Sequence, residues 1–163
     1  MKIYKNANYT TNNVVRFRGN VAERDLQTVM EKLEDYIESE GAKLTGDIIT
    51  AIHVLYLNAR VTDIEIFVAV DKAIPSIKEF TYIHNMELVN CLKVEHRGSP
   101  YLIPGIYTDL HYKAEEMGFE VTQPFYNVSK DKIYGIWVNE CNWVEVDIYA
   151  PQFSLIHLQR SDP

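Results

Sequence analysis

The sequence predicts an α+β protein of two β-α-β-β units with pseudo-two-fold symmetry, in which antiparallel sheets surround a central cleft. Three observations support this. A strand-helix-strand-strand order appears in the first half of the chain, the same order recurs in the second half, and three short motifs repeat at nearly constant spacing. At 163 residues the chain has the length of one domain. We therefore expect a single domain, residues 1–163, with repeats over about residues 3–74 and 85–153.

The first unit opens with a short strand at residues 13–19, followed by a helix. Asn20 can cap this helix, and Glu23 stands three residues later, as in a capping box. Gly41 follows the helix, where a left-handed C-terminal cap is expected. The helical stripe consists of Leu26, Val29, Met30, Leu33 and Ile37. This spacing predicts a helix with one buried face.

Two strands complete the first unit, at residues 47–57 and 61–70. Both segments are rich in β-branched residues, which favour strands. Residues 75–80, PSIKEF, are the natural connection to the second unit.

The second unit opens with a strand at residues 87–98. Ser99 is a cap candidate, and Pro100 occupies the first helical position, where proline is favoured. The helical stripe consists of Ile103, Ile106, Tyr107, Leu110, Ala114 and Met117. Gly118 ends the helix, and Pro104 with Gly105 offers an alternative start.

The last two strands of the second unit are predicted at residues 121–128 and 144–151, with a polar turn around SKDK. Three motif pairs then recur in the same order in both units. They are GAKLT at 41–45 with GFEVT at 118–122, Arg-Gly at 18–19 with 97–98, and EIFVA at 65–69 with DIYAP at 147–151. Their offsets are 118 − 41 = 77, 97 − 18 = 79 and 147 − 65 = 82. Such small drift is what differing loop lengths produce, and it indicates a duplication.

The closing strand places acids and a phenol on one face. Glu145, Asp147 and Tyr149 alternate with Val144, Val146 and Ile148. A solvated face of an antiparallel strand would account for the acids taken singly. The repeat favours a second interpretation, because Glu65 and Asp147 would then occupy matching places on opposite sides of a groove.

The segments "KVEHRGSPYLIPGIYTDLHYKAEEMGFEVTQPFYN" and "VEVDIYAP" resemble the gyrase-inhibitor-like (GyrI-like) family, which includes effector-binding domains of multidrug-responsive transcription regulators. The resemblance extends over about residues 3–153. It implies a duplicated β-α-β-β fold whose central cleft is lined by aromatic residues. It also implies a carboxylate in that cleft that favours cationic, planar, lipophilic molecules.

The sequence departs from the family pattern in three ways. The family's terminal strand usually carries glutamate where this chain has Asp147, with Glu145 two residues earlier, so the carboxylate role stays open between them. The second unit has QPFYN in place of a Gly-Pro turn. No helix-turn-helix segment precedes residue 13, so the expectation is an effector fold without its own DNA-binding domain.

The candidate ligand-binding residues are acids and rings. They are Glu65, Glu145, Asp147, Phe67, Tyr107, Tyr126, Tyr149, Trp137 and Trp143. A buried carboxylate needs a compensating charge, and a cationic ligand supplies it while gaining cation–π attraction to the rings. The alternative for Tyr107, which lies on the helical stripe, is a place in the core.

Composition excludes several classes of function. The formal net charge of −7 argues against direct nucleic-acid binding, which needs a basic patch. No apolar run is long enough to span a membrane and no signal peptide is seen, so we expect a cytoplasmic protein. The histidines lack metal-ligand spacing, and Cys91 and Cys141 are expected to be buried thiols. No metal or cofactor is expected.

Three functions compete at this point. The first is a stand-alone small-molecule or multidrug binding protein, acting as a sensor or regulator. The second is an accessory protein that uses the same fold to bind a protein partner. The third is a hydrolase of electrophilic small molecules, in which Glu145 beside Trp143 would act as general acid or base.

Overall fold

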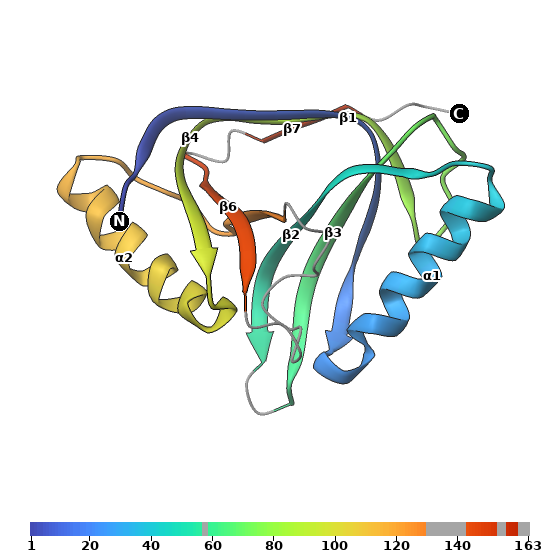
Figure 1. Cartoon of the computed structure of the whole chain (residues 1–163), viewed down its shortest axis with the longest axis horizontal. Coiled ribbons are helices and arrows are strands. Elements are labelled where there is room, and N and C mark those ends of the chain that lie inside the picture. Colours follow the sequence, from blue (N-terminus) through green and yellow to red (C-terminus); the bar gives the residue numbers. More distant parts are fainter. Residues whose placement is uncertain (57–58, 130–142, 153–155, 160–163) are drawn as a thin grey trace.

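The computed structural model describes residues 1–56, 59–129, 143–152 and 156–159, and it confirms an α+β fold (Figure 1). The first unit contains β1 (Tyr4–Ala22), α1 (Leu26–Ser39), β2 (Leu44–Tyr56) and β3 (Val61–Val70). The second unit contains β4 (Thr81–Gly98), α2 (Ile103–Glu116), β5 (Tyr126–Ser129) and β6 (Val144–Ala150). A further strand, β7 (Ile156–Gln159), follows, and short 3-10 turns, η1 (Glu23–Asp25) and η2 (Pro100–Leu102), precede the helices.

The first strand and the helix of the two units repeat at a constant spacing of 77 residues. Strands β1 and β4 begin 81 − 4 = 77 residues apart, and helices α1 and α2 begin 103 − 26 = 77 residues apart. Asn13 and Asn90, also 77 apart, both have a positive φ, 56° and 53°. The Arg-Gly motifs, with their offset of 79, therefore fall two residues out of this register.

Every described strand pairing is antiparallel, in the order β1-β3-β2-β5-β6-β4-β7. An additional pairing between β1 and β4 closes the first six strands into a ring. Thr10 pairs with Glu87, and Thr50 pairs with Asn127. In each pair the two residues are 77 apart, the repeat spacing, so each residue faces its own counterpart in the other unit. A pseudo-two-fold axis would therefore pass through both pairs.

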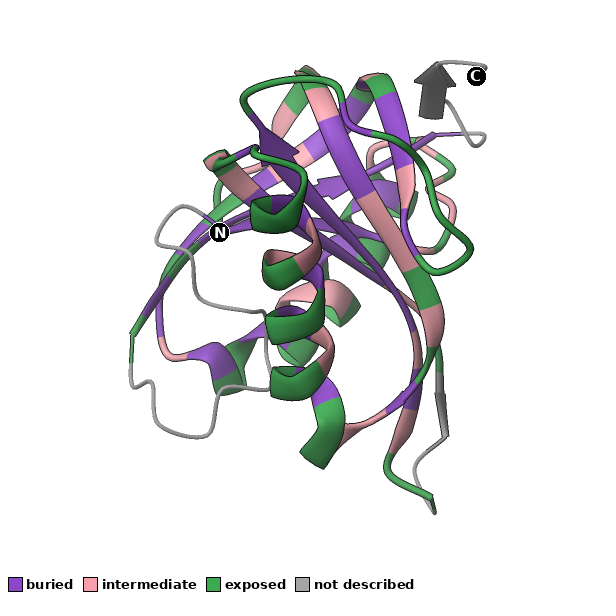
Figure 2. Cartoon of the chain, turned by 90° about the vertical axis from the view of Figure 1, so that its right-hand side faces the viewer, coloured by how far each residue is buried: buried purple, intermediate pink, exposed green. Residues whose placement is uncertain are grey.

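The helices cover the outer faces of two half-sheets, β1-β3-β2 and β5-β6-β4. Helix α1 lies at one end of the molecule and α2 at the other (Figure 1). Leu33 of α1 packs with Ile64, Ile66 and Val68, the alternate residues of β3. Val144, Val146 and Ile148 of β6 pack with α2 in the same way. In Figure 2, exposed residues lie along the outer side of α1, while buried residues line the strands behind it.

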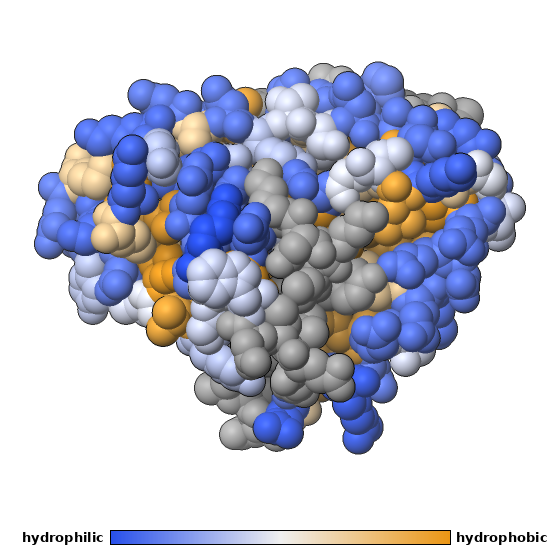
Figure 3. All heavy atoms as spheres, in the orientation of Figure 1, coloured by the Kyte–Doolittle hydropathy of each residue, from blue (hydrophilic) through white to orange (hydrophobic). Residues whose placement is uncertain are grey.

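The faces that the helices do not cover form a third cluster between the half-sheets, which we call the inner cluster. It comprises Val14, Ile49, Ala51, Phe67, Ile83, Met86, Leu88, Cys91, Tyr126, Val128 and Tyr149. The inner cluster occupies the place that the sequence predicted for the cleft. On the face drawn in Figure 3, hydrophilic residues predominate, and hydrophobic residues show beside α1.

The predicted cap at Asn20 is wrong. The ladder between β1 and β3 continues through Asn20, which pairs with Asp63, to Ala22. The strand hydrogen bonds hold this backbone extended, so the helix begins only after the η1 turn. The Ser99 cap is confirmed, because its side chain accepts a hydrogen bond from the Tyr101 amide at the start of η2.

The helix ends are confirmed. Gly41 and Gly118 have φ values of 76° and 77°, the left-handed region that favours glycine. The strand at 61–70 is also confirmed, while β1 and β4 start earlier than predicted, at Tyr4 and Thr81.

The strand predicted at residues 121–128 is wrong over its first half. Strand β5 begins only at Tyr126. Before it, Val121 forms a single bridge to Gln152, and the Gln123–Pro124 peptide bond is cis. Pro124 has no N–H to donate to a ladder, which explains the late start. Strand β6 follows its prediction, and β7 was not predicted.

Cys91 lies fully buried in the inner cluster, and burial raises the pKa of its thiol from 9.0 to about 11. A thiol with a pKa of about 11 instead of 9 has a thiolate fraction at pH 8 that is roughly 100-fold lower. In a Cys141→Ser variant, we expect iodoacetamide to modify Cys91 at least about 100-fold more slowly in the folded protein than in urea. Equal rates would contradict this placement of Cys91.

The raised pKa of Cys91 also determines how pH affects the stability of the fold. Below pH 9 the thiol is neutral in both states, whereas between about 9 and 11 it ionises first in the unfolded chain. The free energy of unfolding therefore decreases as the pH rises through this range, because ionisation of Cys91 favours the unfolded chain.

Candidate functional site

The inner face brings together five of the residues singled out in the sequence. They are Glu65, Phe67, Tyr126, Asp147 and Tyr149, all of them buried. Strand alternation explains this arrangement, because β3 and β6 turn their even-numbered apolar residues toward the helices and their odd-numbered residues inward. The register then sets Tyr126 of β5 beside Tyr149 of β6.

Glu65 is held by two basic side chains. Its Oε2 lies 2.5 Å from Arg16 Nε, and its Oε1 lies 2.6 Å from His53 Nε2. Arg16 comes from β1 and His53 from β2, the two neighbours of β3 in the sheet. Both oxygens of this buried carboxylate are therefore compensated from within the first unit.

Asp147 occupies the matching place in the second unit. Its Oδ2 lies 3.6 Å from Lys93 Nζ, and its Oδ1 lies 3.3 Å from Arg97 Nη1. Lys93 is the counterpart of Arg16, because Arg16 pairs with Phe67 across the strands as Lys93 pairs with Tyr149. The offset of 82 between Glu65 and Asp147 thus matches the geometry.

The second unit extends these contacts into a chain of alternating charges, which we call the Asp147 network. Lys93 Nζ also lies 3.3 Å from Glu95 Oε1, and Arg97 Nε lies 3.8 Å from Glu145 Oε2. The order is Glu95, Lys93, Asp147, Arg97, Glu145. Asp147 is 4% exposed, whereas the side chains of Glu95 and Glu145 are 42% and 48% exposed.

Aromatic rings share the inner face with both acids. The Tyr9 and Tyr149 centroids are 5.7 Å apart, and those of Phe67 and Tyr126 are 6.4 Å apart. Lys93 Nζ lies 5.7 Å from the centroid of Tyr149, within cation–π range. Burial raises the pKa of Tyr126, and the Glu65 carboxylate raises it further. Its phenol therefore stays protonated at neutral pH.

The structure places three other predicted residues away from this group. Tyr107 packs in the α2 cluster and donates a hydrogen bond of 2.5 Å to Asn127 Oδ1, so it approaches β5 from the helix side. Trp143 is 58% exposed, and Glu145 lies at the exposed end of the Asp147 network. Trp137 lies outside the described residues.

Sequence reasoning missed the basic partners and one ring. Arg16, His53, Lys93 and Arg97 were not proposed, and neither was Tyr9, whose hydroxyl donates to Asp47 Oδ2. Identifying them needed the exact register of β1 and β2 on β3 and of β4 on β6, because each base contacts an acid 12 to 54 residues away in the chain.

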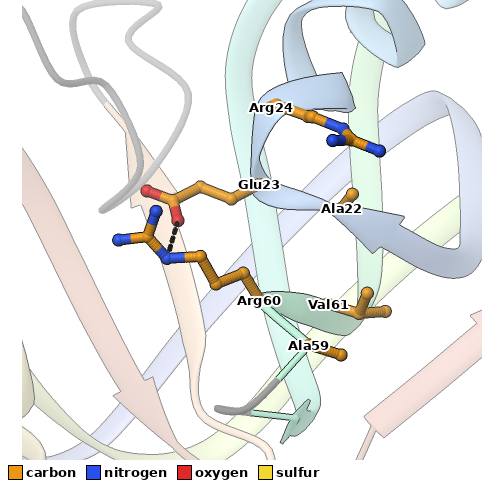
Figure 4. A pocket seen from close by; sticks show the side chains of 6 residues that line it. All are labelled: Ala22, Glu23, Arg24, Ala59, Arg60 and Val61. Carbon is orange, nitrogen blue, oxygen red and sulfur yellow. Dashed lines mark ion pairs between the residues drawn. The ribbon is translucent and has the colours of Figure 1, made fainter.

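Three of the pockets in the described part of the chain are lined by neither Glu65 nor Asp147. The one in Figure 4, about 410 Å³, lies where η1 meets the start of β3. There Glu23 and Arg60 point toward each other and form an ion pair of 3.7 Å, while Arg24 points away from them. Its charges do not converge on one point, so we place the candidate site at the inner face.

Two other searches concern only the described part of the chain. No three side chains of the metal-binding types His, Cys, Asp and Glu gather there as a metal site. Neither described helix has the length and apolar character needed to cross a membrane.

The fold and the site together define a duplicated α+β module with ion-paired acids and rings on its inner face. No family model and no curated protein matches the chain. Among solved structures, the chain is similar to EcmrR in a complex with DNA, with a TM-score of 0.64 and 18% identity, over 98% of this chain and 58% of that chain. SAV2435 bound to tetraphenylphosphonium was also found, with a TM-score of 0.44 and 12% identity, over 94% of both chains. The match to EcmrR concerns the fold, and this chain spans little more than half of that protein.

Proposed function

We propose that this chain is a small-molecule-binding protein that takes cationic, lipophilic aromatic compounds at the inner face, beside Asp147. The observation that carries the proposal is the geometry at Asp147. This buried carboxylate contacts Lys93 and Arg97 at 3.6 and 3.3 Å and shares the inner face with Tyr149. A ligand cation could take the place of one of these bases beside the carboxylate.

The matching site in the first unit is held by shorter contacts. There, Arg16 lies 2.5 Å from one oxygen of Glu65, and His53 lies 2.6 Å from the other. The contacts to Asp147, at 3.3 and 3.6 Å, are longer and thus easier to exchange. We therefore favour Asp147 over Glu145, because Asp147 is buried and shares the inner face with Tyr149.

The ring supports a lipophilic aromatic ligand. Lys93 already lies over Tyr149, so a ligand cation that replaced Lys93 would meet the same aromatic face. We further propose that binding serves sensing or regulation, since the fold resembles a large part of a DNA-bound protein. The net charge of −7 disfavours direct DNA contact by this domain.

The test is ethidium binding, followed by fluorescence, in wild-type protein and in Asp147→Asn. A hydrogen-bonded charge contributes about 1.5–3 kcal/mol, so the variant should bind ethidium roughly 10- to 100-fold more weakly. Nile red, a neutral lipophilic dye, should lose much less affinity, because it gains nothing from the carboxylate.

Asp109→Asn is the matched control, because it makes the same change in charge on the exposed side of α2. It should leave ethidium affinity within about twofold. Thermal melting of each variant shows whether it remains folded. Equal losses for ethidium and Nile red, or no ethidium binding by the wild-type protein, would refute the proposal.

A further inference from the structure

Glu95 and Glu145 lie at the two ends of the Asp147 network, outside the cation contact proposed above. Lys93 Nζ is 3.3 Å from Glu95 and 3.6 Å from Asp147. Arg97 reaches Asp147 through Nη1 at 3.3 Å and Glu145 through Nε at 3.8 Å. Each base therefore already contacts a second carboxylate.

A ligand cation at Asp147 competes with Lys93 and Arg97, because each carboxylate oxygen faces one of these two bases. A displaced base left without a partner in a partly buried site is costly. Lys93 is 22% exposed, so water alone would compensate it poorly. On the other side of the molecule, Arg16 has no second acid partner within the described residues, so Glu65 offers no comparable exchange.

We infer that Glu95 and Glu145 are positioning residues, which hold Lys93 and Arg97 when a ligand cation occupies Asp147. In the ligand-bound state, Lys93 pairs with Glu95, and Arg97 pairs with Glu145. Ligand binding becomes an exchange of ion-pair partners in which no charge is left uncompensated. This inference rests on the proposed function and assigns it two residues that do not touch the ligand.

A double-mutant cycle on Lys93 and Glu95 tests the exchange, with ethidium as the probe. Glu95→Gln should weaken ethidium binding about two- to fivefold, the range expected for one exposed ion pair. Lys93→Met should strengthen it, because the internal competitor for Asp147 is gone. In the Lys93→Met background, Glu95→Gln should change affinity by less than about 1.5-fold, because no base remains to be held.

The cycle separates positioning from simple attraction at a distance. If Glu95 acted only through its charge, Glu95→Gln would weaken ethidium binding equally with and without Lys93, and that result would overturn the role of Glu95. Glu87→Gln is the control on the same strand, since Glu87 accepts a hydrogen bond from the Asn85 side chain and stands outside the contacts of the Asp147 network. It should leave affinity unchanged within about 1.5-fold.

The same cycle with Arg97→Met and Glu145→Gln tests the other end of the network, and each acid is judged by its own cycle. Ethidium binding could depend on Asp147 while the effects of the base and acid substitutions on affinity are additive. That result would overturn the exchange of ion-pair partners and leave the proposed function standing. Absence of ethidium binding in the wild-type protein overturns both.

Discussion

Replacing Phe67 by alanine is expected to lower the free energy of unfolding by about 3–5 kcal/mol. Phe67 is fully buried at the centre of the inner cluster, and its ring packs against Tyr126. The half-sheets hold the surrounding backbone in place through the closed ring of strand pairings, so the cavity left by the ring cannot collapse easily. Urea unfolding, monitored by circular dichroism, measures the change.

Tyr101→Ala is the control for this prediction. Tyr101 is also aromatic but 73% exposed, so its truncation should change the free energy of unfolding by less than about 0.5 kcal/mol. A Phe67→Ala loss as small as the control's would show that the two half-sheets do not pack on each other through this residue.

Removing the guanidinium of Arg16 is expected to cost about 3 kcal/mol of stability. In Arg16→Met, the buried carboxylate of Glu65 loses its partner at 2.5 Å, and an uncompensated buried charge costs about 3–5 kcal/mol. The expected value is at the low end, because His53 still contacts the other oxygen at 2.6 Å.

Arg18→Met is the matched control on the same strand. Arg18 pairs with Asp63 at 3.2 Å, but its side chain is 43% exposed, so the loss should stay within about 1 kcal/mol. The double variant Arg16→Met/Glu65→Leu should recover most of the stability, because it also removes the buried Glu65 carboxylate that Arg16→Met leaves without its guanidinium partner. If Arg16→Met and Arg18→Met were equally mild, the Glu65 ion pair would not be the buried contact that the structure shows.

Local pattern was sufficient to predict most elements of the fold. The helical stripes ending at Gly41 and Gly118 and the alternation in residues 61–70 and 144–150 all reappear in the structure. These signals are local, since one buried face imposes its period on the residues that form it. One error had a long-range cause, at Asn20, which the β1–β3 ladder keeps extended. The late start of β5 had a local cause, because Pro124 has no N–H to donate.

The sequence by itself determined that Glu65 and Asp147 share a face with Phe67 and Tyr149, because side chains alternate along a strand. It also indicated, through the offset of 82, that the two acids match. Whether that face meets water or the other half of the molecule was decided only by the tertiary structure. Strand alternation says which residues point the same way, but not what lies opposite them.

The tertiary structure also decided which charges compensate the acids. Arg16, His53, Lys93 and Arg97 reach Glu65 and Asp147 only after sheet register sets distant segments side by side. The acidic face of NWVEVDIYAP is divided by this packing into an exposed Glu145 and a buried Asp147. Alternation along one strand cannot produce that division, because burial depends on the neighbouring strands and on the second unit.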